Sequence, residues 1–272
     1  MKKSLKYREI IQDVRRVVVK IGTRVLAQKS GRPDVRCMRN LAKQMAEMQR
    51  NGHEVIVVTS GAVGAGMEAL GMDKRPTKLP DLQMAAAVGQ TKLMSRYDEI
   101  FSALGCKIGQ VLLTHDDFQH KIRLTNARRT LENLVRNKVI PIINENDVVA
   151  DEEIKADLAL GDNDLLASLL VKLLRADLLI MLSTVDGIRQ FEQSGRSKRI
   201  RYLECITPKT YSMVTASKSH LSKGGMTSKL NAARSVAKAG CTAIIANGRQ
   251  PGVLSRVMNG EDVGTIILAS GL

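Results

Sequence analysis

The chain has 272 residues, which suits one large α/β domain or two small ones and is enough to bury a sizeable core. Its 42 Lys and Arg against 27 Asp and Glu give a net charge of +15, so contact with a polyanion has to be considered. The basic residues are scattered, however, and the chain has no Trp, three Phe and four Tyr to stack on bases, which argues against a nucleic-acid-binding function. A field of this sign would also attract a small anionic substrate.

The cysteines and the apolar runs indicate the cellular compartment of the protein. The four cysteines, Cys37, Cys106, Cys205 and Cys241, are far apart and form no CxxC pair. Their spacing argues against a zinc site and against a disulfide framework, and fits a reducing cytosol. No run of eighteen apolar residues is present, and the first residues lead into polar sequence rather than into the apolar core of a signal peptide. We therefore expect a cytoplasmic protein that does not enter a membrane.

Short β-branched and aliphatic runs alternate with segments of helical period along the whole length. The runs at 16–21, 54–59, 108–113, 139–143, 178–182 and 242–246 predict buried strands. The segments at 35–48, 85–104, 126–137, 165–175 and 228–239 predict helices. This alternation predicts an α/β fold with a mainly parallel central sheet and helices on both faces, in a single domain. Residues 186–222 are less regular and more basic, and we expect an excursion from the sheet there, with a turn at Gly195.

Polar residues gather where the apolar run 139–143 ends. Ile143-Asn144-Glu145-Asn146-Asp147 closes that run, and Gly161-Asp162-Asn163-Asp164 follows later in the chain. So many acceptors and amide donors indicate a ligand, because a core position cannot satisfy them all. Ligands of open parallel sheets bind just outside the carboxyl ends of the strands. A polar loop with local Asx-turns is the simpler alternative for this cluster taken alone.

Two glycine-bearing strand ends are candidate phosphate contacts. In Lys20-Ile21-Gly22-Thr23, Gly22 allows close backbone approach and Lys20 can neutralise a transferring phosphoryl group. The segment Thr59-Ser60-Gly61-Ala62-Val63-Gly64-Ala65-Gly66 offers backbone N–H groups to an anion at a helix start. Each could also be only a tight strand-to-helix turn. The chain has neither a Rossmann fingerprint nor a Walker loop.

A third candidate is Ser222-Lys223-Gly224-Gly225-Met226-Thr227-Ser228-Lys229, which we expect to lead into a helix. Paired glycines, hydroxyls and lysines at a helix N-terminus would form an anion-binding arrangement. Lys20 and Lys229 could then bracket a polyphosphate, which suits phosphoryl transfer because that reaction depends on positioning and charge neutralisation. Asp162 and Asp164 would hold these lysines or approach Mg²⁺, a hard cation that prefers carboxylate, phosphate and water. Asp162 could instead simply cap the helix that begins near Leu165.

Taken together, these segments resemble the amino-acid kinase family, and within it the kinases that act on glutamate. The matching segments run in order from about Arg16 to Leu268: Val19-Lys20-Ile21-Gly22-Thr23, Val58-Thr59-Ser60-Gly61-Ala62-Val63-Gly64-Ala65-Gly66, Ala87-Val88-Gly89-Gln90, Gly109-Gln110-Val111-Leu112-Leu113-Thr114, Ile143-Asn144-Glu145-Asn146-Asp147, Gly161-Asp162-Asn163-Asp164 and Gly224-Gly225-Met226. One glycine-rich match would be weak, but an ordered series is specific. The resemblance implies the three-layer sandwich of that family.

The resemblance also implies a reaction and its partners. The reaction would be ATP-dependent phosphorylation of the L-glutamate γ-carboxylate, the first step of proline synthesis, with Mg²⁺. A homo-oligomer, feedback inhibition by proline and delivery of the product to a glutamyl phosphate reductase would accompany it. Many bacterial members carry a C-terminal PUA domain, for which this chain, ending at Leu272, has no room; we expect residues 1–272 to be the kinase domain alone.

Roles carry over by matching position. Lys20 and Lys229 would stabilise the transferring phosphoryl group, and Asp162 would organise them. The glutamate-binding residues would be Ser60, Gly61, Asn144, Asp147 and Asn163. The nucleotide would contact Lys20, Gly22, Ser183, Thr184, Lys223, Gly224, Gly225, Met226, Thr227, Ser228 and Lys229. No general base would be needed, because a carboxylate nucleophile is already ionised at neutral pH.

The chain departs from the family pattern in places that leave other functions open. Arg24 stands where many relatives have Ser, Ser222-Lys223 replaces Gly-Thr, and Ser183-Thr184 replaces Thr-Asp. The extra cations are compatible with triphosphate binding but could alter nucleotide preference. The alternatives are a kinase of the same fold that acts on another carboxylate, carbamate or phosphate, a catalytically inactive regulatory homologue, and a polyanion-binding protein.

Overall fold

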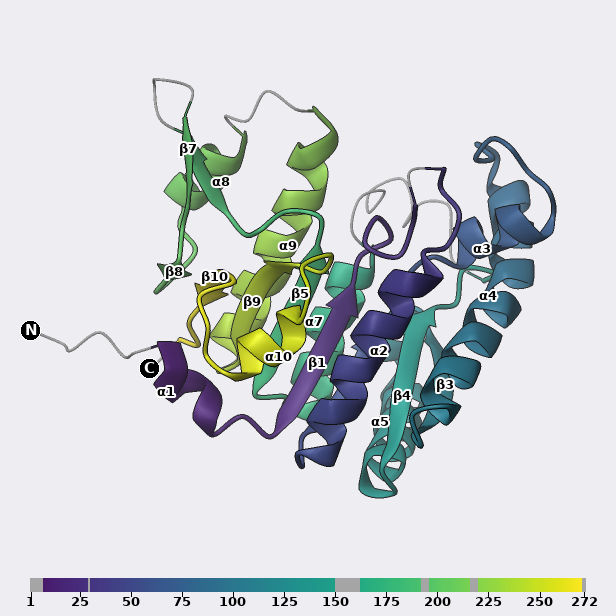
Figure 1. Ribbon diagram of the computed structural model, residues 1–272, viewed down its shortest axis with the longest axis horizontal. Helices are drawn as coiled ribbons and strands as arrows, with labels where there is room; N and C mark the ends of the chain where they lie inside the picture. Colours follow the sequence, from purple (N-terminus) through teal and green to yellow (C-terminus); the bar gives the residue numbers. More distant parts are fainter. Residues whose placement is uncertain (1–6, 29, 150–161, 192–195, 216–219, 271–272) are drawn as a thin grey trace, which may run out of the picture.

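The computed structural model describes residues 7–28, 30–149, 162–191, 196–215 and 220–270, and its elements alternate along the chain as the sequence predicts (Figure 1). The helices are α1 (Tyr7–Gln12), α2 (Val35–Arg50), α3 (Ala62–Ala69), α4 (Leu79–Ser102), the 3₁₀ turn η1 (Asp116–Phe118), α5 (Lys121–Arg136), α7 (Asp162–Leu174), α8 (Pro208–Thr215), α9 (His220–Lys238) and α10 (Val253–Met258). The strands are β1 (Arg16–Ile21), β2 (Glu54–Val58), β3 (Lys107–Leu113), β4 (Val139–Glu145), β5 (Leu178–Ser183), β6 (Arg189–Phe191), β7 (Ser197–Arg199), β8 (Tyr202–Leu203), β9 (Thr242–Asn247) and β10 (Gly264–Ile267).

The central sheet has eight strands in the order β3-β4-β2-β1-β5-β9-β10-β8. The strands predicted from the sequence are all present, and they form its parallel part, from β3 to β9. β10 runs antiparallel to β9, and β8 pairs with β10 at the edge. The prediction of a mainly parallel sheet is therefore confirmed. The sequence did not predict β10 and β8, because runs of four and two residues are too short to show a strand pattern.

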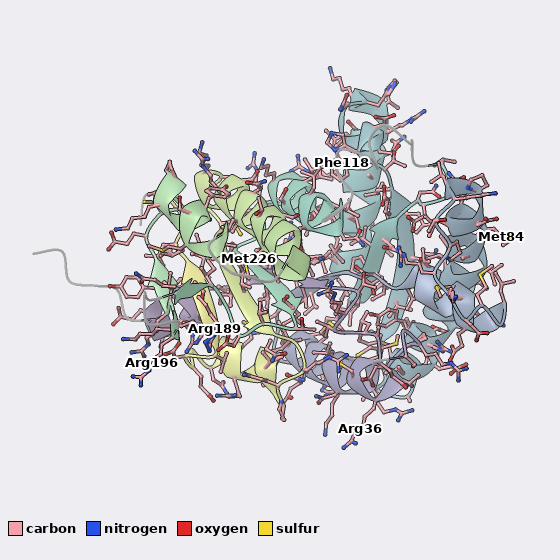
Figure 2. The ribbon with its side chains drawn as sticks, turned by 90° about the horizontal axis from the view of Figure 1, so that it is seen from above. Arg36, Met84, Phe118, Arg189, Arg196 and Met226 are labelled. Carbon is pink, nitrogen blue, oxygen red and sulfur yellow. The ribbon has the colours of Figure 1, made fainter. Side chains whose placement is uncertain are left out.

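Helices cover both faces of the sheet, because alternate residues of each parallel strand point to opposite sides. Val17 and Val19 of β1 belong to the core that contains α2, α4 and α10, whereas Val18 belongs to the core that contains α5, α7 and α9. Figure 2, which looks down from above, shows α5, α7 and α9 on one side and α2 and α10 on the other. This three-layer arrangement brings the N-terminal ends of α2, α3 and α7 to the edge at which the parallel strands end.

Helices α3 and α4 cross so closely that glycine is required at the contact. A Cβ on Gly66 would lie 1.7 Å from the carbonyl oxygen of Ala85, and one on Gly89 would lie 1.8 Å from that of Ala62. Backbone atoms cannot give way by that much, so the two glycines fix how α3 lies against α4. The start of α3 is thereby held beside the end of β2.

The irregular segment after β5 leaves the sheet and returns to it. β6 and β7 pair as an antiparallel hairpin, and β8 then pairs with β10 of the main sheet. Figure 1 shows β7, α8 and the start of α9 extending upward, beyond the sheet. The excursion is confirmed, whereas the turn expected at Gly195 lies outside the described residues. Across those residues, no helix combines the length and apolar character that crossing a membrane requires.

Candidate active site

A carboxylate bridges two buried lysines at the carboxyl edge of the sheet. Asp164, in the first turn of α7, lies with Oδ1 2.7 Å from Nζ of Lys20 and with Oδ2 3.0 Å from Nζ of Lys229. Lys20 stands near the end of β1 and Lys229 on α9, and the three residues are only 1% to 8% exposed. Lys229 also donates to the carbonyl of Gly225, at 3.2 Å. Three elements far apart in sequence thus meet in one ionic cluster.

The cluster carries one more positive than negative charge, and its pKa shifts follow from burial. Burial favours the neutral amine and lowers the pKa of Lys20; the charge of Lys229 acts in the same direction, whereas Asp164 opposes both. Burial alone would raise the pKa of Asp164, but the charges and hydrogen bonds of both lysines hold it below the ordinary value. The excess positive charge makes this a site that attracts an anion.

The residue that bridges the lysines differs from the expected one. The resemblance gave the role of organising the lysines to Asp162, but Asp164 occupies that place. The side chain of Asp162 lies outside the described residues, so its own role stays a prediction. The contacts of Asp164 agree with the expectation from its position that Asp162 and Asp164 would hold the lysines, as far as Asp164 is concerned.

A network of amide side chains lies beside the ionic cluster. Nδ2 of Asn163 donates to the carbonyl of Thr59 at 2.9 Å, to Oγ of Ser60 at 3.0 Å and to Oδ1 of Asn144 at 3.2 Å. Nδ2 of Asn144 donates in turn to Oε1 of Gln90 at 2.9 Å. The ends of β2 and β4, the start of α7 and the middle of α4 are joined by these bonds. Three residues that the sequence predicted to bind substrate, Ser60, Asn144 and Asn163, therefore lie in contact.

Two buried atoms of this network have no hydrogen-bond partner among the described residues. They are Nε2 of Gln90, a donor, and Oδ1 of Asn163, an acceptor. Buried polar atoms are nearly always paired, so an unpaired donor and acceptor in one network indicate a ligand that supplies both functions. An amino acid does so, because its carboxylate accepts and its ammonium group donates.

The remaining predicted substrate residues frame this network. Gly61, with φ of 109°, adopts a left-handed conformation at the N-cap of α3, which a side chain would strain. Asp147 lies half-buried in the turn after β4. Both residues therefore stand at the carboxyl edge, next to the strand ends that carry Ser60 and Asn144.

The predicted nucleotide residues come from three segments of the same edge. The N–H of Gly22 donates to the carbonyl of Leu182 at 3.0 Å, which joins the turn after β1 to the end of β5. Ser183 ends β5, and Thr184 follows it, exposed to solvent. Met226, Thr227 and Ser228 are half-buried on α9, where Figure 2 shows Met226 from above.

The helix that carries Lys229 begins earlier than the sequence predicted. α9 starts at His220 rather than near Ser228, so Gly224 and Gly225 lie within the helix and the prediction that they precede its N-terminus is wrong. The side chain of Lys223 lies outside the described residues. If a phosphate binds at this segment, its contacts would be the ammonium group of Lys229 and the surface left open by the missing side chain of Gly225. Free backbone N–H groups of a helix N-terminus would not take part.

Sequence reasoning missed two polar residues that support the site. Gln90 belongs to a segment that matches the family, Ala87-Val88-Gly89-Gln90, but the sequence assigned it no role. Its hydrogen bond with Asn144 is recognised only in the structure. Tyr97, fully buried, shares a 2.8 Å hydrogen bond with Thr59, the residue that precedes Ser60. Burial raises the pKa of Tyr97, so its hydroxyl stays protonated. Its place about two helical turns after Gln90 and Gly89 on α4 was the available signal.

The fold and the site define a class of protein. Buried lysines held by one carboxylate, at the carboxyl edge of a three-layer α/β sandwich, are suited to a kinase that transfers a phosphoryl group to a small acceptor. The model of the amino acid kinase family matches residues 15–247, and the chain belongs to this family.

Proteins of this family that are similar to the chain over most of its length carry the name of one particular kinase. The glutamate 5-kinase of Citrifermentans bemidjiense is 43% identical over 266 residues, which are 97% of this chain and 70% of that protein. The glutamate 5-kinase of Listeria monocytogenes serotype 4a is 40% identical over 261 residues, 95% of each chain. The solved structure of carbamate kinase from Giardia lamblia bound to AMP-PNP matches with a TM-score of 0.63 and 17% identity, covering 94% of this chain and 99% of that one. That structure shares the fold.

Proposed function

We propose that the chain catalyses ATP-dependent phosphorylation of the γ-carboxylate of L-glutamate, which gives L-glutamyl 5-phosphate and ADP and is the first step of proline biosynthesis. The observation that carries the proposal is the Asp164 bridge between Lys20 and Lys229, with the Asn163–Asn144–Gln90 network beside it. The bridge suits a transferring phosphoryl group and the network suits an amino acid. The relatives that match nearly the whole chain are glutamate 5-kinases.

The chemistry follows from the charges of the site. A γ-carboxylate oxygen of glutamate attacks the γ-phosphorus, the new O–P bond forms, and the bond from that phosphorus to the β–γ bridging oxygen breaks as ADP leaves. The nucleophile is ionised at neutral pH, so no general base is required. Lys20 and Lys229 neutralise the charge on the transferring group from fixed positions, and Asp164 keeps both ammonium groups in place. Because it touches both lysines rather than the reacting atoms, Asp164 is a positioning residue.

Glutamate would be held by the amide network. We assign its α-carboxylate to Nε2 of Gln90 and its ammonium group to Oδ1 of Asn163, the atoms that have no partner among the described residues. Ser60, Gly61, Asn144 and Asp147 complete the proposed substrate site. In this assignment the α-carboxylate and the ammonium group of glutamate are each held by an uncharged amide group, that of Gln90 and that of Asn163.

The nucleotide would lie along Gly22, Ser183, Thr184 and residues 223–229, with its γ-phosphate at the lysines. No cluster of three His, Cys, Asp or Glu side chains that could hold a metal ion occurs within the described ranges. Mg²⁺ fits this site as an ion carried by phosphate and water oxygens, where it would neutralise charge on the phosphates. The protein's own contribution is then the pair of lysines.

The proposed activity also implies an inhibitor, an assembly and a second enzyme that uses the product. We propose that proline inhibits the enzyme, that it forms a homo-oligomer, and that a glutamyl phosphate reductase consumes its labile product. We also propose that residues 1–272 act as one kinase domain in the cytoplasm; the scattered cysteines and the eight-stranded central sheet, to which strands from β1 to β10 contribute, support this.

The test is formation of γ-glutamyl hydroxamate by purified protein given Mg²⁺-ATP, glutamate and hydroxylamine, with coupled measurement of ADP release. L-aspartate and N-acetyl-L-glutamate serve as competing acceptors, and the assay is repeated with proline. We expect turnover that is selective for glutamate and suppressed by proline. A better acceptor in the panel would assign the chain to another reaction of the family, and the absence of turnover beside an active control enzyme would reject the proposal.

A further inference from the structure

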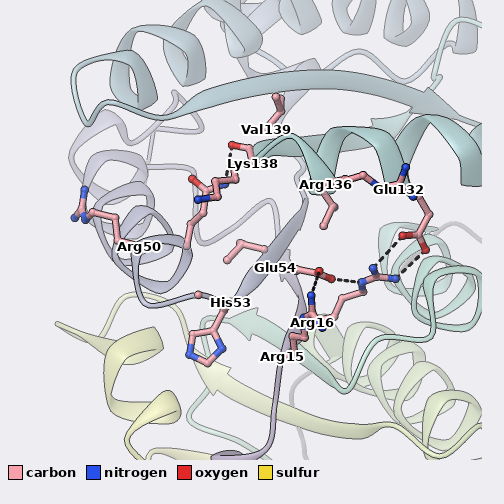
Figure 3. Close-up of a pocket in the computed structure, with 13 residues that line it drawn as sticks. Arg15, Arg16, Arg50, His53, Glu54, Glu132, Arg136, Lys138 and Val139 are labelled. Carbon is pink, nitrogen blue, oxygen red and sulfur yellow. Dashed lines mark hydrogen bonds and ion pairs between the residues drawn. The ribbon is translucent and has the colours of Figure 1, made fainter.

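A basic pocket of about 410 Å³ lies at the amino-terminal edge of the sheet, opposite the candidate active site (Figure 3). The ends of α2 and α5 and the starts of β1, β2 and β4 surround it. β1 begins at the pocket with Arg16 and ends near the active site with Ile21, so the two sites are separated by the length of a strand, roughly 17–20 Å. The kinase reaction makes no use of this pocket.

The floor of the pocket is electrically balanced. The guanidinium of Arg16 binds both carboxylate oxygens of Glu132, at 2.9 and 3.0 Å, and its Nε lies 2.7 Å from Oε2 of Glu54. Arg15 lies 3.3 Å from the other oxygen of Glu54. The backbone N–H groups of both arginines donate to Oδ2 of Asp177, which fixes the start of the strand. Arg16, Glu54 and Glu132 therefore form a partly buried ion-pair network, to which Arg15, with a side chain 77% exposed, adds a second positive charge.

The rim of the pocket carries positive charge without compensation. Arg50, Arg136 and Lys138 are exposed, and none forms an ion pair with a carboxylate in the part of the chain that the structure describes. Arg50 is held by a hydrogen bond to the carbonyl of Leu104, at 3.5 Å. The three cations come from α2, α5 and the turn before β4, and all three residues line the pocket.

The backbone fixes the position of Lys138 at the rim of the pocket. Lys138 follows the C-cap of α5 with φ of 56°, a left-handed conformation that favours Gly or Asn at this position. Its carbonyl accepts a hydrogen bond from Nε2 of Gln49 at 3.0 Å, which holds the strained residue in place. Lys138 directly follows the C-cap of α5, so its charge lies at the end of the helix where the dipole favours a cation.

We propose that this pocket binds a compact anion with several phosphate charges, of the pyrophosphate class. Guanidinium and ammonium groups from different elements match phosphate oxygens, and the two carboxylates that line the pocket, Glu54 and Glu132, are already paired with Arg15 and Arg16. The lining contains no Phe, Tyr or Trp, and the imidazole of His53, which lies 3.0 Å from the carbonyl of Val14 through Nδ1, is the one aromatic ring among the lining residues, so the pocket offers little for stacking a nucleobase. The ligand class is therefore a small phosphorylated compound rather than a nucleic acid. This proposal is independent of the proposed kinase reaction.

The test is calorimetric titration of inorganic pyrophosphate into three forms of the full chain in low-salt buffer. They are the wild type, the pocket variant Arg136→Gln with Lys138→Gln, and the control variant Arg128→Gln with Arg129→Gln. The control removes the same charge from exposed residues of the same helix that do not line the pocket, roughly 10–12 Å along the helix from Arg136. We expect at least about a tenfold weaker affinity in the pocket variant and a change of less than about twofold in the control.

Equal affinity in the three proteins would place the anion elsewhere, including at the lysines of the active site, and would overturn the proposal, as would the absence of saturable binding to the wild type. A second variant separates binding from folding. Lys138→Gly relieves the left-handed backbone, so its midpoint of thermal unfolding should rise while its affinity for pyrophosphate falls. Unchanged affinity in this stabilised variant would also count against the site.

Discussion

Lys20 Nζ and Asp164 Oδ1 lie 2.7 Å apart, and their side chains are 6% and 1% exposed. Burying either charge alone would cost several kcal/mol, so each residue depends on the other to remain ionised inside the protein. Asp164 binds Lys229 through its second oxygen, which allows two like charges to stay close together.

Removal of either lysine should abolish efficient turnover. We expect Lys20→Ala and Lys229→Ala each to lower kcat by at least about a hundredfold, the scale for losing a preorganised charge contact. Lys172→Ala, which removes an exposed lysine of α7, is the control and should keep wild-type kcat. The measurement is the kcat of ADP release at saturating substrates. Wild-type turnover in either variant would remove that lysine from the mechanism.

The two neighbouring aspartates should respond differently to neutral substitution. Asp164→Asn keeps the size of the side chain but leaves the lysines without their common counter-charge, so kcat should fall by at least about a hundredfold. Asp162→Asn, which leaves the lysine bridge intact, should lower kcat less. Steady-state kinetics of both variants decide between them. A larger loss of kcat in Asp162→Asn would return the organising role to that residue.

The Asp164 carboxylate should also make stability depend on pH. Its pKa in the folded protein is below the ordinary value of 3.8. The stabilisation is therefore fully present above that ordinary value and is lost as the pH falls through the lower, folded-state pKa. The difference in unfolding free energy between wild type and Asp164→Asn should be constant from neutral pH to about pH 5 and shrink in stronger acid. A difference that grows as the pH falls would contradict the assigned charge state.

Substrate affinity should depend on the amide network and not on the lysines. Gln90→Leu removes the unpaired donor, and Asp147→Ala removes the carboxylate after β4. Both should raise the KM for glutamate while leaving the KM for ATP near that of the wild type. Initial-rate kinetics with each substrate varied in turn provide the measurement. If glutamate KM were unchanged in a variant, that residue would lie outside the substrate site.

Much of the fold was predictable because the parallel strands are buried on both faces and therefore read as continuous apolar runs. Val17, Val18 and Val19 fill cores on both sides of β1, and no other element type suits such a run. β8 and β10 were missed because two to four residues give no period. The start of α9 was misplaced because Gly224 and Gly225 have the composition of a helix boundary although they lie inside the helix.

The site was predictable as a set of strand ends, but not in its detailed contacts. Asp162 and Asp164 stand in the same first turn of α7. The contact of Asp164 with both lysines depends on how α7 packs against β1 and α9, and the sequence does not give that packing. Gln90 meets Asn144 only because Gly66 and Gly89 allow α3 and α4 to cross closely. Such contacts depend on packing between distant segments.

We expect Gly225 to lower the stability of the fold and to favour nucleotide binding. It lies inside α9 without a left-handed φ, and a Cβ added to it would meet no atom within 4 Å. Gly225→Ala should therefore raise the free energy of unfolding by roughly 0.5–1 kcal/mol, the usual cost of glycine within a helix. If glycine is kept so that phosphate can approach the backbone beside Lys229, the same change should raise the KM for ATP. Ser235→Ala, later on the helix, is the control and should leave that KM unchanged; a stabilised Gly225→Ala enzyme with wild-type KM would place the nucleotide elsewhere.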